Sequence, residues 1–153
     1  MRTLETKIPP PIVMGLLGIM AWFGSDHLPS LSFRMPFNLP IAVAVAVAGL
    51  FLNAFPKVAF RRAGTTVNPL RPAAVTHLVT SGVYRYSRNP MYLGHAVILF
   101  GWAIYLRNIG SFAVVPAFVL YISRFQIGPE ERNLYARFAE EYTAFCRRSP
   151  RWL

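Results

Sequence analysis

The chain has 153 residues, of which 54% are hydrophobic and only 14% are charged, and its net charge is +10. Average soluble domains contain about 25% charged residues and disordered chains have low hydrophobicity, so this composition excludes both classes, and the length allows a single domain. A chain that is basic and apolar indicates a nucleic acid or an anionic membrane as partner, and the apolar excess favours the lipid bilayer.

The chain contains four runs without a charged residue, which are 18, 22, 18 and 16 residues long. A bilayer core of about 30 Å requires about 20 helical residues, and a soluble fold of this size could not bury four such runs on all sides. The runs are Ile8–Ser25, Met35–Pro56, Asn89–Leu106 and Asn108–Ser123. The membrane spans that we expect lie at about residues 8–25, 36–56, 90–106 and 108–124.

Three of these runs have individual features. Prolines at positions 9–11 interrupt the first run, which argues against a cleaved signal peptide. In the second run, Ala and Val alternate with the period of a strand, but the alternation has no polar face. The fourth run is short, so Arg107 and Arg124 must extend their side chains outward from its ends. The fold class that we predict is all-α: one polytopic membrane domain over residues 1–153 with about four transmembrane helices.

Arginine and lysine are distributed unevenly between the segments that connect the spans. With four spans, 14 cations fall on one side of the membrane and 2 on the other. Because positive charges collect on the cytoplasmic side, both termini are expected there, with the cell inner membrane as the location. The basic segments 57–89 and 125–153 then lie on the same side, where they can meet.

Residues 68–94 form a segment that is too polar for a span over most of its length. Tyrosines at positions 84, 86 and 92 are interleaved with arginines, among them Arg88. Asn89–Pro90 suits the start of the third apolar helix, with Asn as the cap and Pro in the first turn. One interpretation is an interfacial belt, in which tyrosines lie at headgroup level and arginines bind lipid phosphate.

The last segment, Gly128–Arg151, has the pattern of a C-terminal amphipathic helix. Gly128–Pro129 precedes Glu130 and Glu131, which suit the positive end of a helix dipole and predict a helix start. An apolar stripe follows at helical spacing, and the alternative interpretation is a helix that lies on the membrane surface. The stripe consists of Leu134, Phe138, Tyr142 and Phe145.

Several motifs that would define other sites are absent from the sequence. It contains no G-x-G-x-x-G and no P-loop, which excludes a Rossmann cofactor site on motif grounds. The three histidines have no metal spacing, so no metal is expected, and no nucleic acid is expected as partner. Cys146, the single cysteine, is more consistent with a small apolar filler than with a nucleophile.

Two blocks in the C-terminal half resemble the signatures of the isoprenylcysteine carboxyl methyltransferase and bacterial phospholipid methyltransferase-like family. The first block reads Leu-Val-Thr-Ser-Gly-Val-Tyr at 78–84, followed by Arg-Asn-Pro-Met-Tyr-Leu-Gly at 88–94. The second contains Glu130-Glu131-x-x-Leu134, Phe138, Glu141-Tyr142 and Arg148-x-Pro150-Arg151. The blocks occur in the family's order, separated by one apolar hairpin, and together they are specific.

The resemblance implies an integral membrane enzyme that binds S-adenosylmethionine without a Rossmann domain, at the cytoplasmic face between the two signature segments. The histidine that usually precedes the proline is Asn89 here, whose amide still donates and accepts hydrogen bonds. Arg88 could pair with the carboxylate of the cofactor, and tyrosine faces could hold its sulfonium cation. The cofactor-binding positions implied are Thr76, His77, Leu78, Val79, Tyr84, Arg88, Asn89, Pro90, Met91, Tyr92 and Glu130.

The methyl acceptor is expected to be lipophilic and to enter from the bilayer. Enzymes of the family that act on prenylcysteine have an arginine where this chain has Gln126, and an amide holds a carboxylate less well than a guanidinium group. An amine acceptor must lose a proton, which Glu131 or Glu130 could receive. A carboxylate or thiolate acceptor would instead need an arginine such as Arg124 or Arg148. Glu131 and Arg148 are therefore the candidate catalytic residues, and Gln126 and Arg124 are the candidate substrate contacts.

Two other functions match parts of the pattern. Membrane reductases of the sterol-reductase type resemble this family in their C-terminal part, but they need a nicotinamide site, for which the sequence offers no residues. A non-enzymatic membrane scaffold, whose arginine and tyrosine belts only anchor lipid, would tolerate Arg88→Lys without loss of function.

Overall fold

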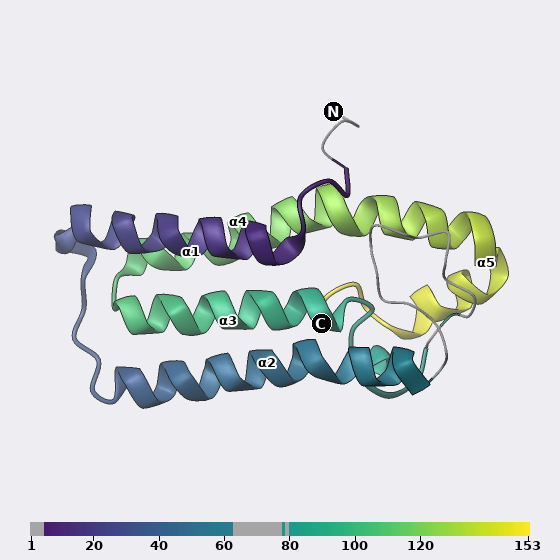
Figure 1. Cartoon of the computed structure of the whole chain (residues 1–153), viewed down its shortest axis with the longest axis horizontal. Helices are drawn as coiled ribbons and strands as arrows, with labels where there is room; N and C mark the ends of the chain where they lie inside the picture. The colour runs from purple at the N-terminus through teal and green to yellow at the C-terminus, as the bar shows by residue number, and fades with distance from the viewer. Residues whose placement is uncertain (1–4, 63–77, 79) are drawn as a thin grey trace.

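The computed structural model describes residues 5–62, 78 and 80–153. Every regular element in these residues is helical, which confirms the predicted all-α class for the part of the chain described. Figure 1 shows long helices side by side, with α5 extending beyond them and turning back at one end. The α-helices are α1 Pro10–His27, α2 Asn38–Arg62, α3 Pro90–Leu106, α4 Val114–Ile122 and α5 Gly128–Arg148. Short 3-10 turns are η2 Pro29–Leu31, η4 Gly82–Arg85 and η5 Ile109–Ala113, and η6 Ser123–Ile127 is a π-helical turn.

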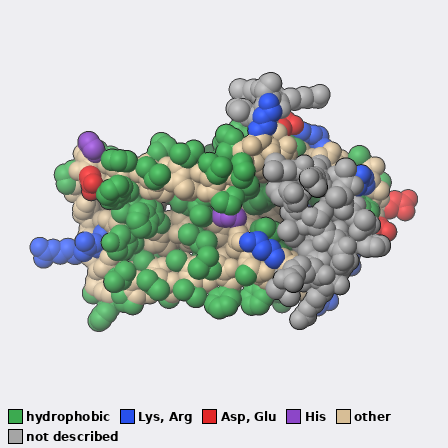
Figure 2. Space-filling view, in the orientation of Figure 1, with side chains coloured by type: hydrophobic (Ala, Val, Ile, Leu, Met, Phe, Trp, Pro, Cys, Tyr) green, Lys and Arg blue, Asp and Glu red, His purple; other side chains and the backbone are tan. Residues whose placement is uncertain are grey.

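Two helices in the described residues are long and apolar enough to cross a membrane, Asn38–Lys57 in α2 and the continuous helix Ile109–Arg148. The apolar stretch of the second helix ends near Arg124, and α3 is apolar but shorter. Only 17% of the apolar window in α2 is buried inside the protein, and Figure 2 shows hydrophobic side chains spread over the long helices. Exposed apolar surface of this extent is suited to lipid rather than water. The count of four spans stays a prediction.

Glycines hold α2 and α3 at backbone contact. A Cβ atom on Gly94 would lie 2.6 Å from the Gly49 carbonyl oxygen, and one on Gly101 would lie 2.9 Å from the Ala42 carbonyl oxygen. Small residues let membrane helices approach closely enough for extensive van der Waals contact. This contact places the first turn of α3 beside Asn53 of α2, whose side-chain amide donates to the Met91 carbonyl at 3.2 Å.

Gly94→Ala is expected to lower the free energy of unfolding by about 1–3 kcal/mol, because the added methyl group overlaps backbone atoms of α2. Gly15→Ala is the matched control, since a Cβ atom at Gly15 meets no atom within 4 Å. Thermal unfolding in detergent measures both variants. Equal unfolding temperatures for the two would contradict the close packing of α2 against α3.

The C-terminal helix begins differently from the sequence prediction. We expected a helix start at Gly128–Pro129, but α5 continues from α4 without a break through η6. Pro129 has no N–H to donate to the Phe125 carbonyl one turn earlier, and the Thr6 N–H donates to that oxygen instead, at 2.9 Å. The prediction was wrong because the wider π turn and this partner from the N-terminal segment let the helix pass the proline.

A sharp bend in α5 returns the C-terminal half of the helix toward the start of α3 (Figure 1). The bend occurs at Phe138, whose backbone angles of φ −123° and ψ 23° are not helical. The apolar stripe of α5 faces the protein at this point, because Tyr142 and Phe145 are buried against Tyr84 of η4. The stripe predicted from the sequence is therefore present, and it packs on the first signature segment.

Candidate functional site

The two signature segments lie in contact at one end of the helices. The segment around η4 and the first turn of α3 face the start of α5 and its returning C-terminal half. The C-terminal residues 149–152 lie beside the start of α3 as well. Side chains from positions about 40 residues apart in sequence therefore meet in one polar site.

A partly buried carboxyl group, Glu130, lies against the hydroxyl group of Tyr92. That hydroxyl donates a hydrogen bond to Glu130 Oε1 at 2.5 Å. Burial raises the pKa of Glu130 to about 7; the hydrogen bond from Tyr92 opposes the rise, and the charge of Glu131 adds to it. A carboxyl group that changes protonation near neutral pH has the property that a catalytic proton acceptor requires.

Two buried tyrosines, Tyr92 and Tyr84, lie near this carboxyl group. Tyr84 is 6% exposed, and its burial and the nearby charge of Glu130 raise the pKa of Tyr84 above its ordinary value. Tyr142 and Phe145 pack on Tyr84, and Leu78 is partly buried against the same cluster. Burial and the charge of Glu131 also raise the pKa of Tyr142, so the tyrosine hydroxyls remain protonated near neutral pH.

Glu131, the next residue, has a different environment, because two guanidinium groups occupy its carboxylate. Arg88 Nη2 donates to Glu131 Oε1 at 3.0 Å, and Arg151 donates to both carboxylate oxygens at 3.1 and 2.6 Å. Hydrogen bonding to Glu131 raises the pKa of Arg151. Arg88 Nη1 donates to the Cys146 carbonyl at 3.3 Å, and Arg88 Nε is buried without a hydrogen-bond partner. Within the described residues, Glu130 forms no such ion pair.

The π turn η6 orients the two predicted substrate contacts differently. Gln126 is 1% exposed and donates from Nε2 to the Ile8 carbonyl at 2.7 Å, while its Oε1 is buried without a hydrogen-bond partner. Arg124 is exposed and pairs with Glu5 at 3.4 Å. A buried acceptor without a donor is costly, so the free hydrogen-bonding capacity of the Gln126 side chain is that of an acceptor.

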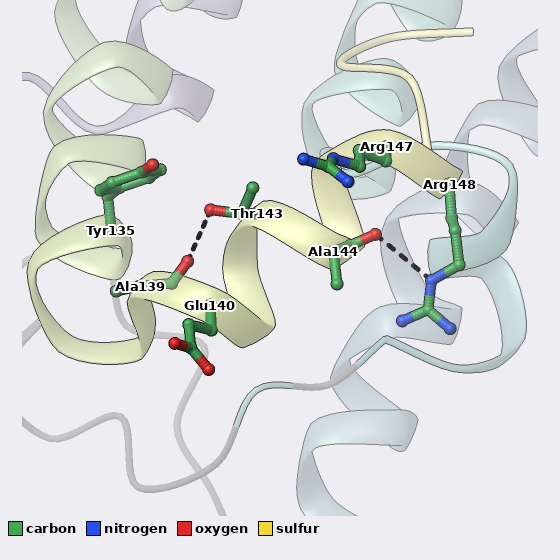
Figure 3. Close-up of a pocket in the computed structure, with 7 residues that line it drawn as sticks. All are labelled: Tyr135, Ala139, Glu140, Thr143, Ala144, Arg147 and Arg148. Carbon is green, nitrogen blue, oxygen red and sulfur yellow. Dashed lines mark hydrogen bonds between the residues drawn. The ribbon is translucent and has the colours of Figure 1, made fainter.

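Arg148, the second predicted catalytic residue, lies on an exposed part of α5. Its Nε donates to the Ala144 carbonyl one turn earlier, at 3.3 Å. Among the described residues, Arg148 makes no hydrogen bond or ion pair with Glu130 or Glu131. Figure 3 shows it with Arg147 at a shallow hollow along α5. The other lining residues are Tyr135, Ala139, Glu140, Thr143 and Ala144.

The start of α3 supports the remaining predicted cofactor residues. Pro90 is buried in the first helical position, as expected, but Asn89 makes no side-chain cap. Its Nδ2 donates instead to the Arg151 carbonyl at 3.0 Å, so the capping prediction was wrong because a partner from the C-terminus competes for the amide. The Met91 carbonyl accepts from Asn53. Three further predicted positions, Thr76, His77 and Val79, lie outside the described residues.

Sequence reasoning did not single out some residues that the structure brings to the site. Arg151 is recognisable in the sequence only as part of the second signature block. No pattern in the sequence indicates a role at the site for Ser123, Trp152 or Asn53. Arg151 lies 20 residues from Glu131, and this spacing predicts no contact. No group of three or more His, Cys, Asp or Glu side chains suited to a metal occurs in the described part of the chain.

The architecture and this site define a class: an all-helical membrane protein with a polar site at the helix ends, containing one partly buried glutamate and one paired glutamate. Comparison with protein families is specific, because residues 37–141 match the model of the phospholipid methyltransferase family. The chain therefore belongs to the phospholipid methyltransferase family, a family of membrane methyltransferases. An uncharacterized protein of Haemophilus influenzae is 38% identical over 63 residues, which are 41% of this chain and 100% of that protein. No solved structure matches the chain.

Proposed function

We propose that this protein transfers a methyl group from S-adenosylmethionine to the amine of a lipophilic acceptor. The observation that carries the proposal is the hydrogen bond from Tyr92 to Glu130, near the buried Tyr84, at the helix ends. Family membership supports methyl transfer at a membrane. It favours neither a sterol-type reductase nor a non-enzymatic scaffold.

The residues present suit the chemistry of this cofactor. When bound, S-adenosylmethionine supplies an electrophilic methyl group on a sulfonium centre. Tyr84 and Tyr92 offer aromatic faces to a cation, and each such contact contributes about 0.5–2 kcal/mol. The unpartnered Nε of Arg88 is a donor that a carboxylate can use. Leu78 and the positions Thr76, His77, Val79, Asn89, Pro90 and Met91 remain proposed contacts around it.

We assign the proton transfer to Glu130 rather than to Glu131. The carboxylate of Glu131 is occupied by Arg88 and Arg151, whereas Glu130 has a hydroxyl donor and a pKa near neutrality. A bound cofactor would supply the methyl group, with its C–S bond breaking and neutral S-adenosylhomocysteine leaving. The carboxylate of Glu130 would accept the proton that the amine nitrogen loses.

The charges near the site favour an amine over a carboxylate or thiolate acceptor. Gln126 Oε1 and the carboxylate of Glu130 both accept hydrogen bonds, which an amine can donate and a carboxylate cannot. Of the arginines that an anionic acceptor would need, Arg124 is already paired with Glu5. Arg148 lies on the exposed hollow instead.

Purified protein in proteoliposomes with labelled S-adenosylmethionine tests the function directly. Label is expected in the amine lipid when phosphatidylethanolamine is present, and not in a prenylcysteine acid offered in its place. Label in the prenylcysteine product would overturn the amine assignment. No transfer to any lipid, together with no cofactor binding by calorimetry, would overturn the function. Thermal stabilisation by NADPH in place of S-adenosylmethionine would favour the reductase.

For the location, we propose the cell inner membrane with both termini in the cytoplasm, supported by the distribution of 14 cations against 2. A reporter fused after Leu153 is expected to be active in the cytoplasm. The same reporter inserted between residues 28 and 34 is the control and is expected on the outer side. An outer location for the Leu153 fusion contradicts the topology.

A further inference from the structure

The C-terminal segment 149–152 is bound to the first signature segment by its backbone. The Arg88 N–H donates to the Pro150 carbonyl at 2.9 Å, and Asn89 Nδ2 donates to the Arg151 carbonyl at 3.0 Å. Two consecutive carbonyl groups of the C-terminal segment therefore accept hydrogen bonds from two consecutive residues just before α3. Backbone contacts of this kind fix the path of the segment without depending on its side chains.

The side chain of Arg151 continues this contact to α5. Its Nε and Nη2 donate to the two carboxylate oxygens of Glu131, and Arg88 approaches the same carboxylate from the opposite segment. A planar guanidinium group that binds both oxygens fixes the orientation of the carboxylate as well as its distance. Glu131 follows Glu130 directly in α5, so holding Glu131 between Arg88 and Arg151 fixes the position of the helix turn that carries Glu130.

The side chain of Trp152 extends the segment to the π turn. Trp152 Nε1 donates to Ser123 Oγ at 3.0 Å, and its ring packs on the hydrophobic core formed by α1, α3 and α4. Ser123 is the first residue of η6, whose extra residue sets the rotation of everything that follows, including Glu130. The segment thus contacts both ends of the short stretch that carries Gln126 and Glu130.

We propose that Arg151 and Trp152 are positioning residues that hold Glu130 against Tyr92 for cofactor binding. The proposal rests on the proposed function, and it assigns the C-terminal segment to the active site. Neither side chain contacts Glu130 in the described residues, so both act through other groups, Arg151 through Glu131 and Trp152 through Ser123. Group transfer requires side chains held to within about 0.5 Å, which explains why a segment without chemistry of its own affects the reaction.

Arg151→Ala is expected to raise the KM for S-adenosylmethionine and the Kd for S-adenosylhomocysteine about 10-fold, and to lower kcat as well, because Glu130 is the proposed proton acceptor. Arg151→Lys retains the positive charge but not the planar guanidinium group that binds both carboxylate oxygens of Glu131. Its KM and Kd are therefore expected about threefold above the wild-type values. Arg147→Ala, an exposed arginine on α5, is the matched control and keeps wild-type values. Calorimetry with S-adenosylhomocysteine gives a binding measurement that is independent of turnover.

The route through Glu131 is tested by a double-mutant cycle. If Arg151 acts through Glu131, adding Arg151→Ala to Glu131→Gln changes the Kd by less than about twofold. If the changes in Kd caused by the two single substitutions multiply in the double variant, Arg151 does not act through Glu131. Trp152→Phe and Ser123→Ala remove the same hydrogen bond, so the double variant is expected to match either single variant.

The outcomes separate this inference from the proposed function. A wild-type protein that binds no cofactor and transfers no methyl group overturns the proposed function. A wild-type protein that is active, with Arg151→Ala and Trp152→Phe indistinguishable from it in KM and Kd, overturns only the positioning role. A parallel loss of thermal stability, kcat and binding in Arg151→Ala, without recovery in Arg151→Lys, assigns the segment to folding alone and also overturns the inference.

Discussion

Glu130→Gln is expected to lower methyl transfer by about 100-fold or more, because general-base catalysis typically contributes about 10²–10⁴-fold. The amide has nearly the same size and shape as the carboxyl group, but it does not accept a proton near neutral pH. The hydrogen bond from Tyr92 can persist, since the amide oxygen is also an acceptor. Initial rates with labelled S-adenosylmethionine in proteoliposomes measure the loss.

The comparison with other acidic residues gives this prediction its specificity. Glu140→Gln removes an exposed charge from the same helix and is expected to retain the wild-type rate. Thermal unfolding of Glu130→Gln should show no loss of stability near neutral pH, because burial opposes the charged form of Glu130. A Glu130→Gln variant that retains more than about a tenth of the rate would remove this residue from proton transfer.

The rate of methyl transfer is expected to depend on pH through the ionisation of Glu130. Burial raises the pKa of this carboxyl group to about 7, so the group is neutral below that pH and ionised above it. Only the ionised form accepts a proton or attracts the sulfonium cation. The value of kcat/KM should therefore fall about tenfold for each pH unit below 7 and approach a plateau above it.

Tyr92→Phe is expected to move this pH profile toward higher pH. The hydroxyl of Tyr92 donates to Glu130 and stabilises its charged form, so the pKa of Glu130 rises when the hydroxyl is removed. A hydrogen bond to a charged group contributes about 1.5–3 kcal/mol, which corresponds to a shift of about 1–2 pH units. Tyr105→Phe, at the opposite end of α3, is the control. An unchanged profile in Tyr92→Phe would show that another group titrates.

Much of the fold follows from local patterns in the chain. The apolar runs predict α1 and α3 to within two residues, and α2 and α4 to within six, because apolar segments in lipid must satisfy their backbone groups internally. For the same reason the alternating Ala and Val residues lie within α2 and not in a strand. The stripe that contains Tyr142 and Phe145 is also recognisable, since helical spacing places its members on one face.

The features that the patterns did not predict depend on partners distant in sequence. The helix start at Gly128 was wrong because Thr6 supplies a donor to the Phe125 carbonyl. The cap at Asn89 was wrong because the Arg151 carbonyl attracts the amide. In both cases a local preference worth about 1 kcal/mol gives way to a tertiary contact that no periodicity reveals.

The composition, the four apolar runs and the two signature blocks could be read from the chain alone, and they predict a membrane methyltransferase with Tyr92 and a pair of glutamates at its site. The different environments of Glu130 and Glu131 are decided by the tertiary structure. Both residues are carboxylates one position apart, and their sequence environment is nearly the same. Folding brings Arg88 and Arg151 to Glu131 and the hydroxyl of Tyr92 to Glu130. Nearby charges, hydrogen bonds and burial set the protonation of a carboxyl group. The partners that folding brings to each glutamate therefore determine what its carboxyl group can do.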